Sequence, residues 1–140
     1  MTAILDAGPL VALADVNDPM QERVERVLRR ERGSLIVPAP VSAEVDYLLG
    51  KRVGRQARLA FIEDVAAGRF GVECLLPEEY PAVADLDRRY SNLDAGLADL
   101  SVVILAGRFR TRRLVSFDAR DFRSIVPLQG GAFTLLPADS

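Results

Sequence analysis

The chain has 140 residues and no histidine; 49% of its residues are hydrophobic, 27% are charged, and the formal net charge is −2. This size and composition predict one globular domain over residues 1–140 and exclude a disordered chain. The charge balance excludes binding of nucleic acid by bulk electrostatic attraction. A single cysteine, Cys74, rules out an internal disulfide and fits a reducing cytoplasm. The N-terminus lacks the basic start of a signal peptide, and no apolar run has the length of a membrane span.

Short apolar stretches alternate with longer amphipathic ones along the whole chain. The first half predicts strands at Ala3–Leu5 and Leu35–Val37 and helices opened by Gly8-Pro9, by Asp18-Pro19 (with Gly33 as its C-cap) and by Pro40 (through Leu49). The second half predicts a helix at Gly54–Ala67, an extended segment at Val72–Leu75, a helix from Pro77, the most apolar helix at Leu97–Arg108, a core strand at Arg113–Phe117 and an edge strand at Ala132–Leu135. This alternation is typical of the α/β class, with a parallel sheet covered by helices on both faces.

Apolar residues at helical spacing predict which helix faces point inward. Three of the predicted helices show such a face, formed by Met20, Val24, Val27 and Leu28; by Leu59, Ile62 and Val65; and by Tyr80, Val83 and Leu86.

Two acids directly follow predicted strands. Asp6 comes after Ala3–Leu5, and Asp118 comes after Arg113–Phe117. Ligands of parallel sheets bind outside the carboxyl ends of the strands, so both carboxylates should lie at the same edge of the sheet. A helix N-cap is the alternative interpretation of Asp6. The coincidence of two such positions favours a site.

Two further acids lie within apolar helices. Glu44 shares a face with Val41, Val45 and Leu48, at a spacing that points toward a core. Asp99 lies near the start of the most apolar helix, where a favourable interaction with the helix dipole is the alternative explanation. Asp94 can take that dipole position instead, which leaves Asp99 with little structural reason to be acidic.

Burying one carboxylate costs several kcal/mol unless its charge is compensated. Four acids spread along the chain therefore suggest a shared pocket for a divalent cation, and Mg²⁺ and Mn²⁺ prefer such oxygen ligands. Without histidine, imidazole acid–base catalysis and a Ser-His-Asp triad are excluded. A bound ion can acidify an attacking water and neutralise a phosphate, so the pattern indicates a metal-dependent hydrolase, and a nuclease in particular.

The four acids in this order resemble the PIN-domain ribonucleases, and most of all the VapC-type toxins of bacterial toxin–antitoxin pairs. The matching stretches span nearly the whole chain: ILDAGPLVAL, PVSAEVDYLLGKRVG, GLADLSVVILAGRFRTRRLVSFDARDF and GGAFTLLP. The resemblance implies a three-layer α/β/α PIN-like domain with a short, mostly parallel sheet. It also implies a Mg²⁺-dependent endoribonuclease, with Mn²⁺ as a second usable ion, that cleaves structured RNA such as tRNA or rRNA. The catalytic and metal-site residues would be Asp6, Glu44, Asp99 and Asp118.

The same resemblance implies a VapB-type antitoxin as partner, a homodimer, a cytoplasmic location and no membrane association. We expect the antitoxin to cover the acidic pocket with a basic side chain, because an arginine forks onto two carboxylates. The apolar helices near Met20–Leu28 and Val41–Leu49 are the candidates for the groove that receives its hydrophobic residues.

The chain departs from the family pattern at two positions. Ala7-Gly8 follow Asp6 where the family usually has a hydroxyl residue, and Ser116 stands where threonine is common. Asp121 is either an extra ligand or a surface acid, and we expect it at the surface. The missing hydroxyl is the one feature that favours the alternative function, a non-catalytic PIN-like module that binds RNA or protein. A response-regulator receiver domain is disfavoured because the only lysine, Lys51, is in the wrong place.

The basic residues are also uneven, with 17 arginines and one lysine. Six arginines surround Asp118 in the sequence, and they form either a phosphate-binding cluster or a solvated surface. They are Arg108, Arg110, Arg112, Arg113, Arg120 and Arg123.

Overall fold

The computed structural model of the protein describes residues 1–31 and 33–140 and contains one five-stranded sheet. Its strands are β1 (Ala3–Leu5), β2 (Leu35–Pro38), β3 (Gly71–Glu73), β4 (Arg113–Val115) and β5 (Thr134–Leu136). Their order is β3-β2-β1-β4-β5, and neighbouring strands pair in parallel. The predicted parallel sheet is confirmed, with the segment around Val72 as strand β3 and the last strand at an edge.

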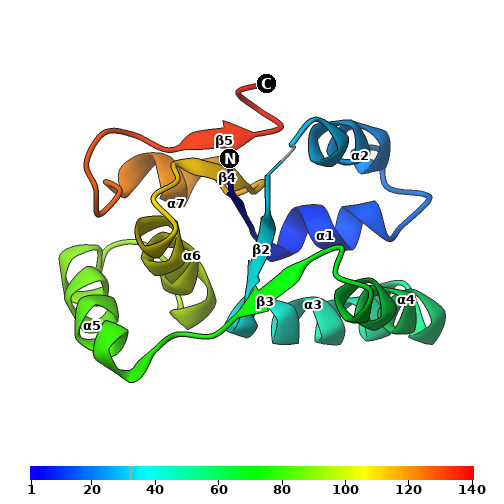
Figure 1. Ribbon diagram of the computed structural model, residues 1–140, viewed down its shortest axis with the longest axis horizontal. Helices are drawn as coiled ribbons and strands as arrows, with labels where there is room; N and C mark the ends of the chain where they lie inside the picture. Colours follow the sequence, from blue (N-terminus) through cyan, green and yellow to red (C-terminus); the bar gives the residue numbers. More distant parts are fainter. Residues whose placement is uncertain (32) are drawn as a thin grey trace.

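Helices cover both faces of the sheet, which gives three layers (Figure 1). On one side lie α1 (Ala7–Leu13), α2 (Gln21–Arg30), α3 (Ala39–Arg52) and α4 (Arg55–Ala66). On the other lie α5 (Tyr80–Arg89), entered through a short 3₁₀ turn at Pro77–Glu79, then α6 (Leu97–Arg108) and α7 (Ala119–Ser124). The three-layer prediction is therefore confirmed, and α7 is a helix that the sequence patterns did not predict.

The order in which the chain adds strands to the sheet reverses between β1 and β4. From β1 the chain moves outward to β2 and β3, and it then crosses back to place β4 on the other side of β1. The final residues of these two central strands, Leu5 and Val115, are paired with each other. A crevice forms where strand order reverses in such sheets, at the carboxyl ends of the strands. The topology therefore places Asp6 and Ser116, the next residues along, beside that crevice.

The core is centred on β1 and α6. Ala3, Ile4 and Leu5 are fully buried, and α6 is buried continuously from Leu100 to Ala106. A helix buried on nearly all sides needs apolar residues around its whole circumference, which is the pattern of this segment. Helix α6 has the bounds that the sequence predicted.

Two predicted inward faces need correction. On α4, Ile62 is 42% exposed and Phe61 is buried instead. The ring of Phe61 packs against Phe70, which follows the helix, with 6.1 Å between ring centroids. That contact turns a different side of α4 toward the core. On α5, Val83 and Leu86 are buried as predicted, whereas Tyr80 is largely exposed.

The end of α2 also differs from the prediction. The helix ends at Arg30, with Glu31 rather than Gly33 at the C-cap position. The Glu31 carboxylate accepts two hydrogen bonds from the Arg113 guanidinium, at 2.6 and 2.9 Å. This forked contact ties the end of α2 to β4.

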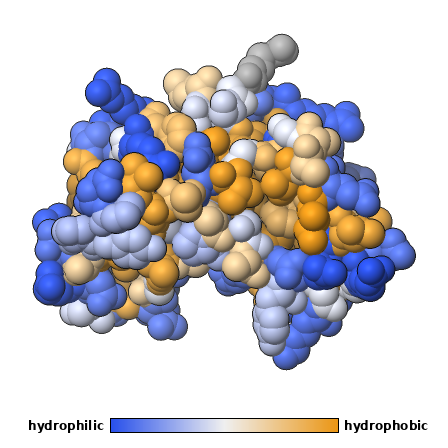
Figure 2. Space-filling view, turned by 60° about the horizontal axis from the view of Figure 1, so that its bottom comes forward, coloured by the Kyte–Doolittle hydropathy of each residue, from blue (hydrophilic) through white to orange (hydrophobic). Residues whose placement is uncertain are grey.

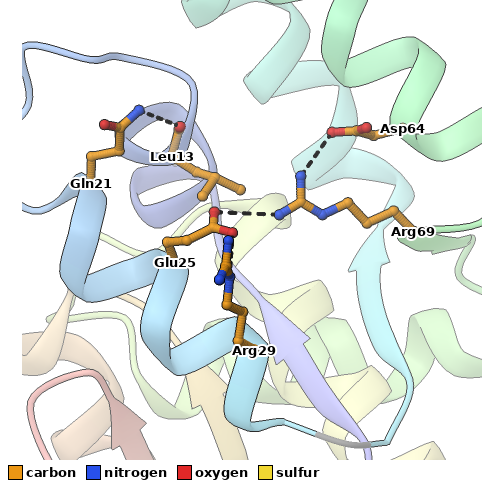
Figure 3. Close-up of polar contacts among 6 residues, drawn as sticks. All are labelled: Leu13, Gln21, Glu25, Arg29, Asp64 and Arg69. Carbon is orange, nitrogen blue, oxygen red and sulfur yellow. Dashed lines mark hydrogen bonds and ion pairs between the residues drawn. The ribbon is translucent and has the colours of Figure 1, made fainter.

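A polar cluster joins α2 to the end of α4 (Figure 3). Glu25 lies 3.0 Å from Arg29 and 3.5 Å from Arg69, which also pairs with Asp64 at 3.2 Å. Nearby, the Gln21 amide donates to the carbonyl of Leu13 at 3.0 Å. The cluster borders a small apolar cleft between α1 and α4, which is lined by Leu10, Leu13, Ala14, Ala57, Ala60, Phe61, Asp64, Arg69 and Phe70.

Candidate acidic site at the carboxyl ends of β1 and β4

Asp6 is the most buried of the four predicted site acids. It occupies the N-cap position of α1, yet its side chain makes no capping hydrogen bond. One carboxylate oxygen instead accepts a 2.7 Å hydrogen bond from the hydroxyl of Ser116. Burial raises the pKa of Asp6, the Ser116 hydrogen bond opposes that rise, and the charge of Asp118 adds to it. The geometry favours the site interpretation of Asp6 over the cap.

Asp118 is held in place by its own local structure. It forms the N-cap of α7, where its side chain accepts a 3.1 Å hydrogen bond from the amide of Asp121. Its own amide donates to the Ser116 hydroxyl at 3.0 Å. Ser116 therefore connects the acids that follow β1 and β4, a role that the sequence patterns did not reveal.

Asp99 reaches the same region from the first turn of α6. Its carboxylate accepts a 3.3 Å hydrogen bond from the amide of Gly96, the N-cap residue. Burial raises the pKa of Asp99 to about 6, and the charges of Asp6, Asp118 and Glu44 contribute to the rise. Asp94 precedes the helix and does not occupy its first turn, so that prediction is wrong. Asp99 thus has both a helix-start contact and a share in the acidic cluster.

Glu44 approaches from α3 and is the most accessible of the four. Partial desolvation raises the pKa of Glu44, the charge of Asp6 adds to this, and the charge of Arg52 opposes it. The expectation that Glu44 faces the core is wrong, because the buried stripe of α3 consists of Val41, Val45 and Leu49. Its carboxylate lies instead at the rim of the acidic site.

The charges of the four acids act on one another, but none of the four forms an ion pair with a basic side chain of the described residues. Within residues 1–31 and 33–140, the ion pairs between side chains leave out Asp6, Glu44, Asp99 and Asp118. Like charges raise one another's pKa values, and a divalent cation reverses this by favouring the ionised forms.

The surface toward the lower edge of Figure 1, where β1 and β2 end, is hollowed between two lobes (Figure 2).

The acids are not drawn together into a closed ligand set. Among the described residues, no three histidine, cysteine or acid side chains are close enough to hold an ion jointly. An octahedral Mg²⁺ keeps several waters and uses one or two carboxylates, so an open arrangement of this kind suits it better than it suits a caged ion. Asp6, which accepts a hydrogen bond from Ser116, and Asp99 could serve as direct ligands of such an ion.

Asp121 corrects one prediction. Its side chain is only 8% exposed, whereas a surface acid was expected. Burial raises the pKa of Asp121, and the neighbouring Asp118 raises it further. The helical turn at Ala119–Ser124 turns this side chain inward beside the buried Phe122. Asp121 is thus a fifth acid bordering the site.

Most of the arginines near Asp118 have structural partners. Arg108 pairs with Glu79 and donates to the carbonyl of Cys74. Arg112 donates to the carbonyls of Gln129 and Gly130. Arg113 and Arg123 pair with Glu31 and Asp139. Four of the six therefore bind other parts of the fold, and four of the six (Arg110, Arg112, Arg120 and Arg123) are exposed, which favours the solvated-surface interpretation.

The described part of the chain also contains no helix with the length and apolarity of a membrane span.

Comparison with known proteins agrees with this geometry. Residues 3–126 match the family model of the PIN domain. Ribonuclease VapC26 of Mycobacterium tuberculosis (strain ATCC 25618 / H37Rv) is 34% identical over 134 residues, which cover 96% of this chain and 99% of the relative.

Two solved structures share the fold at 16% sequence identity. VapC20 of Mycobacterium tuberculosis, described as a Sarcin-Ricin loop cleaving toxin, superimposes with a TM-score of 0.76 over 83% of this chain and 89% of that one. VapBC2 of Rickettsia felis, solved with a DNA fragment from its promoter, gives a TM-score of 0.72 over 96% and 98%. The family match and the 34% identity over nearly the full length together show that the chain belongs to the PIN domain family and, within it, to the VapC ribonucleases.

Proposed function

We propose that the protein is a Mg²⁺-dependent endoribonuclease and the toxin of a type II toxin–antitoxin system, and that it cleaves structured RNA such as tRNA or rRNA. The observation that carries this proposal is the group of four acids around the ends of β1 and β4. Among the described residues, none of these acids forms an ion pair. Three of these acids have raised pKa values. Such a group stays negatively charged at neutral pH far more readily with a cation than without one.

The donor set fits Mg²⁺, and Mn²⁺ as a substitute. All of the candidate ligands are hard oxygen donors, and the chain has no histidine to favour zinc or copper. Asp6 and Asp99 would bind the ion directly, and Glu44 and Asp118 would act through its waters. When bound, the ion supplies an acidified water and neutralises charge on a phosphate.

The side chains themselves have the task of orientation. Ser116 fixes the rotamer of Asp6 through its 2.7 Å hydrogen bond, and the first turn of α7 fixes Asp118. Glu44, exposed on α3, is free to orient a water by accepting its hydrogen bond. With no imidazole in the chain, proton transfer during phosphodiester hydrolysis falls to carboxylates and water.

The relatives support RNA as the substrate. The curated relative is a ribonuclease, and the solved VapC20 is described as cleaving the Sarcin-Ricin loop, an RNA structure. A chain with net charge −2 gains little from general attraction to RNA. Selection of a folded RNA therefore rests on local contacts near the acidic site.

A VapB-type antitoxin is the proposed inhibitor. The solved VapBC2 contains such a pair. An antitoxin arginine would satisfy two carboxylates of the site at once and compete with the ion. The apolar helix faces first expected to receive its hydrophobic residues are unsuitable, because Val24, Val27, Val41 and Val45 are buried in the core. The cleft between α1 and α4 is an accessible apolar surface that suits this role. A homodimer is also part of the proposal, and the mass of the protein in solution tests it.

The deciding experiment incubates the purified protein with total RNA and maps the new RNA ends. We expect cleavage with Mg²⁺ or Mn²⁺, none in EDTA, and restoration when the metal is added back. Expression alone should stop growth, and co-expression of a short upstream reading frame should restore it. Full RNA cleavage in EDTA, or a harmless and inactive protein, would contradict the proposal.

The alternative function, a non-catalytic PIN-like module, had one supporting feature, the absence of a hydroxyl residue after Asp6. The hydroxyl of Ser116 donates to Asp6 from β4. The departure at Ala7-Gly8 thus leaves Asp6 with a hydrogen-bond donor, and the case for a non-catalytic module weakens.

A further inference from the structure

An aromatic side chain lies at the rim of the acidic site. Phe117 sits between Ser116, which binds Asp6, and Asp118, which caps α7. Its side chain is 41% exposed, whereas the next phenylalanine, Phe122, is completely buried. Phe117 therefore contributes little to the core, and its ring is accessible beside the acids.

The ring of Phe117 rests on Gly8, in the first turn of α1. A β-carbon added to Gly8 would lie 3.0 Å from Cδ2 and 3.6 Å from Cγ of that ring. The first distance is tighter than most β-carbon contacts, so a side chain at position 8 would require the ring to shift by a few tenths of an ångström. Glycine after Ala7 and phenylalanine before Asp118 therefore form a matched pair across the ends of β1 and β4.

We propose that Phe117, seated on Gly8, is a stacking platform for a nucleobase next to the phosphate that is cleaved. This inference rests on the proposed function and specifies how that site holds its RNA. A base is joined to its phosphate through a single sugar, so an accessible ring beside the phosphate-cleaving acids is within reach of a neighbouring base. Unpaired bases of RNA are commonly held by stacking on aromatic side chains.

Charge supports the same assignment. The chain has net charge −2, and Arg112, Arg113 and Arg123 near this segment are engaged with other parts of the fold. Stacking adds affinity without positive charge and tolerates different bases, because every base has an aromatic face. Arg120, two positions after Asp118, stays exposed and can contact a phosphate, and stacking on Phe117 adds affinity that such a contact does not supply.

The chain offers a direct reporter, because it contains no tryptophan. Phe117→Trp places the only indole at the proposed platform. In EDTA, where cleavage is prevented, we expect a mixed-sequence oligoribonucleotide to quench the fluorescence of this indole, and the same oligomer with abasic sugars to quench it far less. Val126→Trp is the matched control, since Val126 is 53% exposed and its amide donates to the hydroxyl of Tyr90 at the end of α5, and we expect no quenching there.

Cleavage provides the second measurement. Phe117→Ala should lower kcat/KM for RNA by about 10- to 100-fold, which is the effect of removing one stacked base. Phe117→Tyr should keep most of the activity, because it keeps the ring. Phe117→Leu should behave like alanine although it preserves apolar packing. Gly8→Ala should shift the ring. We expect it to lower the affinity for RNA that carries its bases and to leave the affinity for abasic RNA nearly unchanged.

Each outcome decides the inference. Equal quenching by normal and abasic RNA, no quenching of the Phe117→Trp indole, or unchanged kcat/KM in Phe117→Leu would overturn it. Unchanged RNA binding by Phe117→Ala, together with a lost affinity for the antitoxin, would overturn it in favour of a protein contact. The fluorescence measurement needs no catalysis, so a protein that stacks RNA but fails to cleave it would contradict the proposed function and support the platform.

Discussion

The hydroxyl of Ser116 donates a 2.7 Å hydrogen bond to the carboxylate of Asp6, across 110 positions of sequence. The same oxygen accepts the amide of Asp118 at 3.0 Å. One hydroxyl thereby sets the positions of two acids that follow neighbouring strands. It also gives Asp6 a hydroxyl donor, which Ala7 and Gly8, the residues directly after Asp6, cannot supply.

Ser116→Ala removes both of these contacts. We expect RNA cleavage to fall by about 10- to 100-fold, as when a group that orients a metal ligand is lost. The folded protein should lose about 1 kcal/mol of unfolding free energy, since a buried hydrogen bond disappears. Ser124→Ala is the control, because that exposed hydroxyl donates only to the carbonyl of Arg120. Equal cleavage by both variants would show that Ser116 does not position the acids.

Asp99→Asn tests whether the acidic cluster serves function at the expense of stability. Loss of a direct metal ligand should exceed the effect of losing an orienting group, so we expect cleavage to fall about 100-fold or more. Without metal, the melting temperature should stay unchanged or rise, because one member of a repulsive cluster becomes neutral. Asp87→Asn, on the exposed side of α5, should change neither quantity. A joint collapse of activity and stability would make Asp99 a structural residue.

The raised pKa of Asp99, about 6, predicts a pH dependence of the metal-free protein. Below pH 3.8, its ordinary value, both folded and unfolded states hold the proton. Between that value and about 6 the unfolded chain releases the proton while the folded protein keeps it, so unfolding free energy falls as pH rises. Urea titrations of wild type and Asp99→Asn across this window should diverge, with wild type losing more. Parallel curves would mean an ordinary pKa.

Metal binding should be visible without any catalysis. Mg²⁺ that binds only the folded state stabilises it by about 2.7 kcal/mol at 100 times its dissociation constant. We therefore expect Mg²⁺ to raise the melting temperature of wild type and to raise that of Asp99→Asn much less. An equal shift in both proteins would assign the bound ion to another part of the surface.

Much of the arrangement follows from local sequence patterns. Helix α6 has the predicted bounds because it is apolar on every side, which leaves no ambiguity about its burial. Asp6 and Asp118 follow strands whose order in the sheet makes them neighbours. The rule that ligands of parallel sheets bind at the carboxyl ends of the strands therefore predicted that Asp6 and Asp118 lie near each other.

The remaining features depend on tertiary contacts that no local pattern encodes. Phe61 rather than Ile62 faces inward because Phe70 arrives from beyond the helix. Asp121 is buried because Asp118 begins a helical turn that swings it inward. The sequence patterns assign Arg113 either to a phosphate-binding cluster or to a solvated surface, and its partner Glu31 lies 82 positions earlier. In each case the deciding neighbour is absent from the local sequence window.

The position of β4 beside β1 also bears on how the protein is made. Strand β1 is synthesised first, but its neighbour β4 and the adjoining Ser116 and Asp118 appear more than a hundred residues later, after β2 and β3. Contacts between such distant segments form late in folding. A chain still growing on the ribosome thus has Asp6 and Glu44 without their counterparts. The complete set of acids exists only once translation has passed Asp118, so this site cannot assemble before β4 has been made.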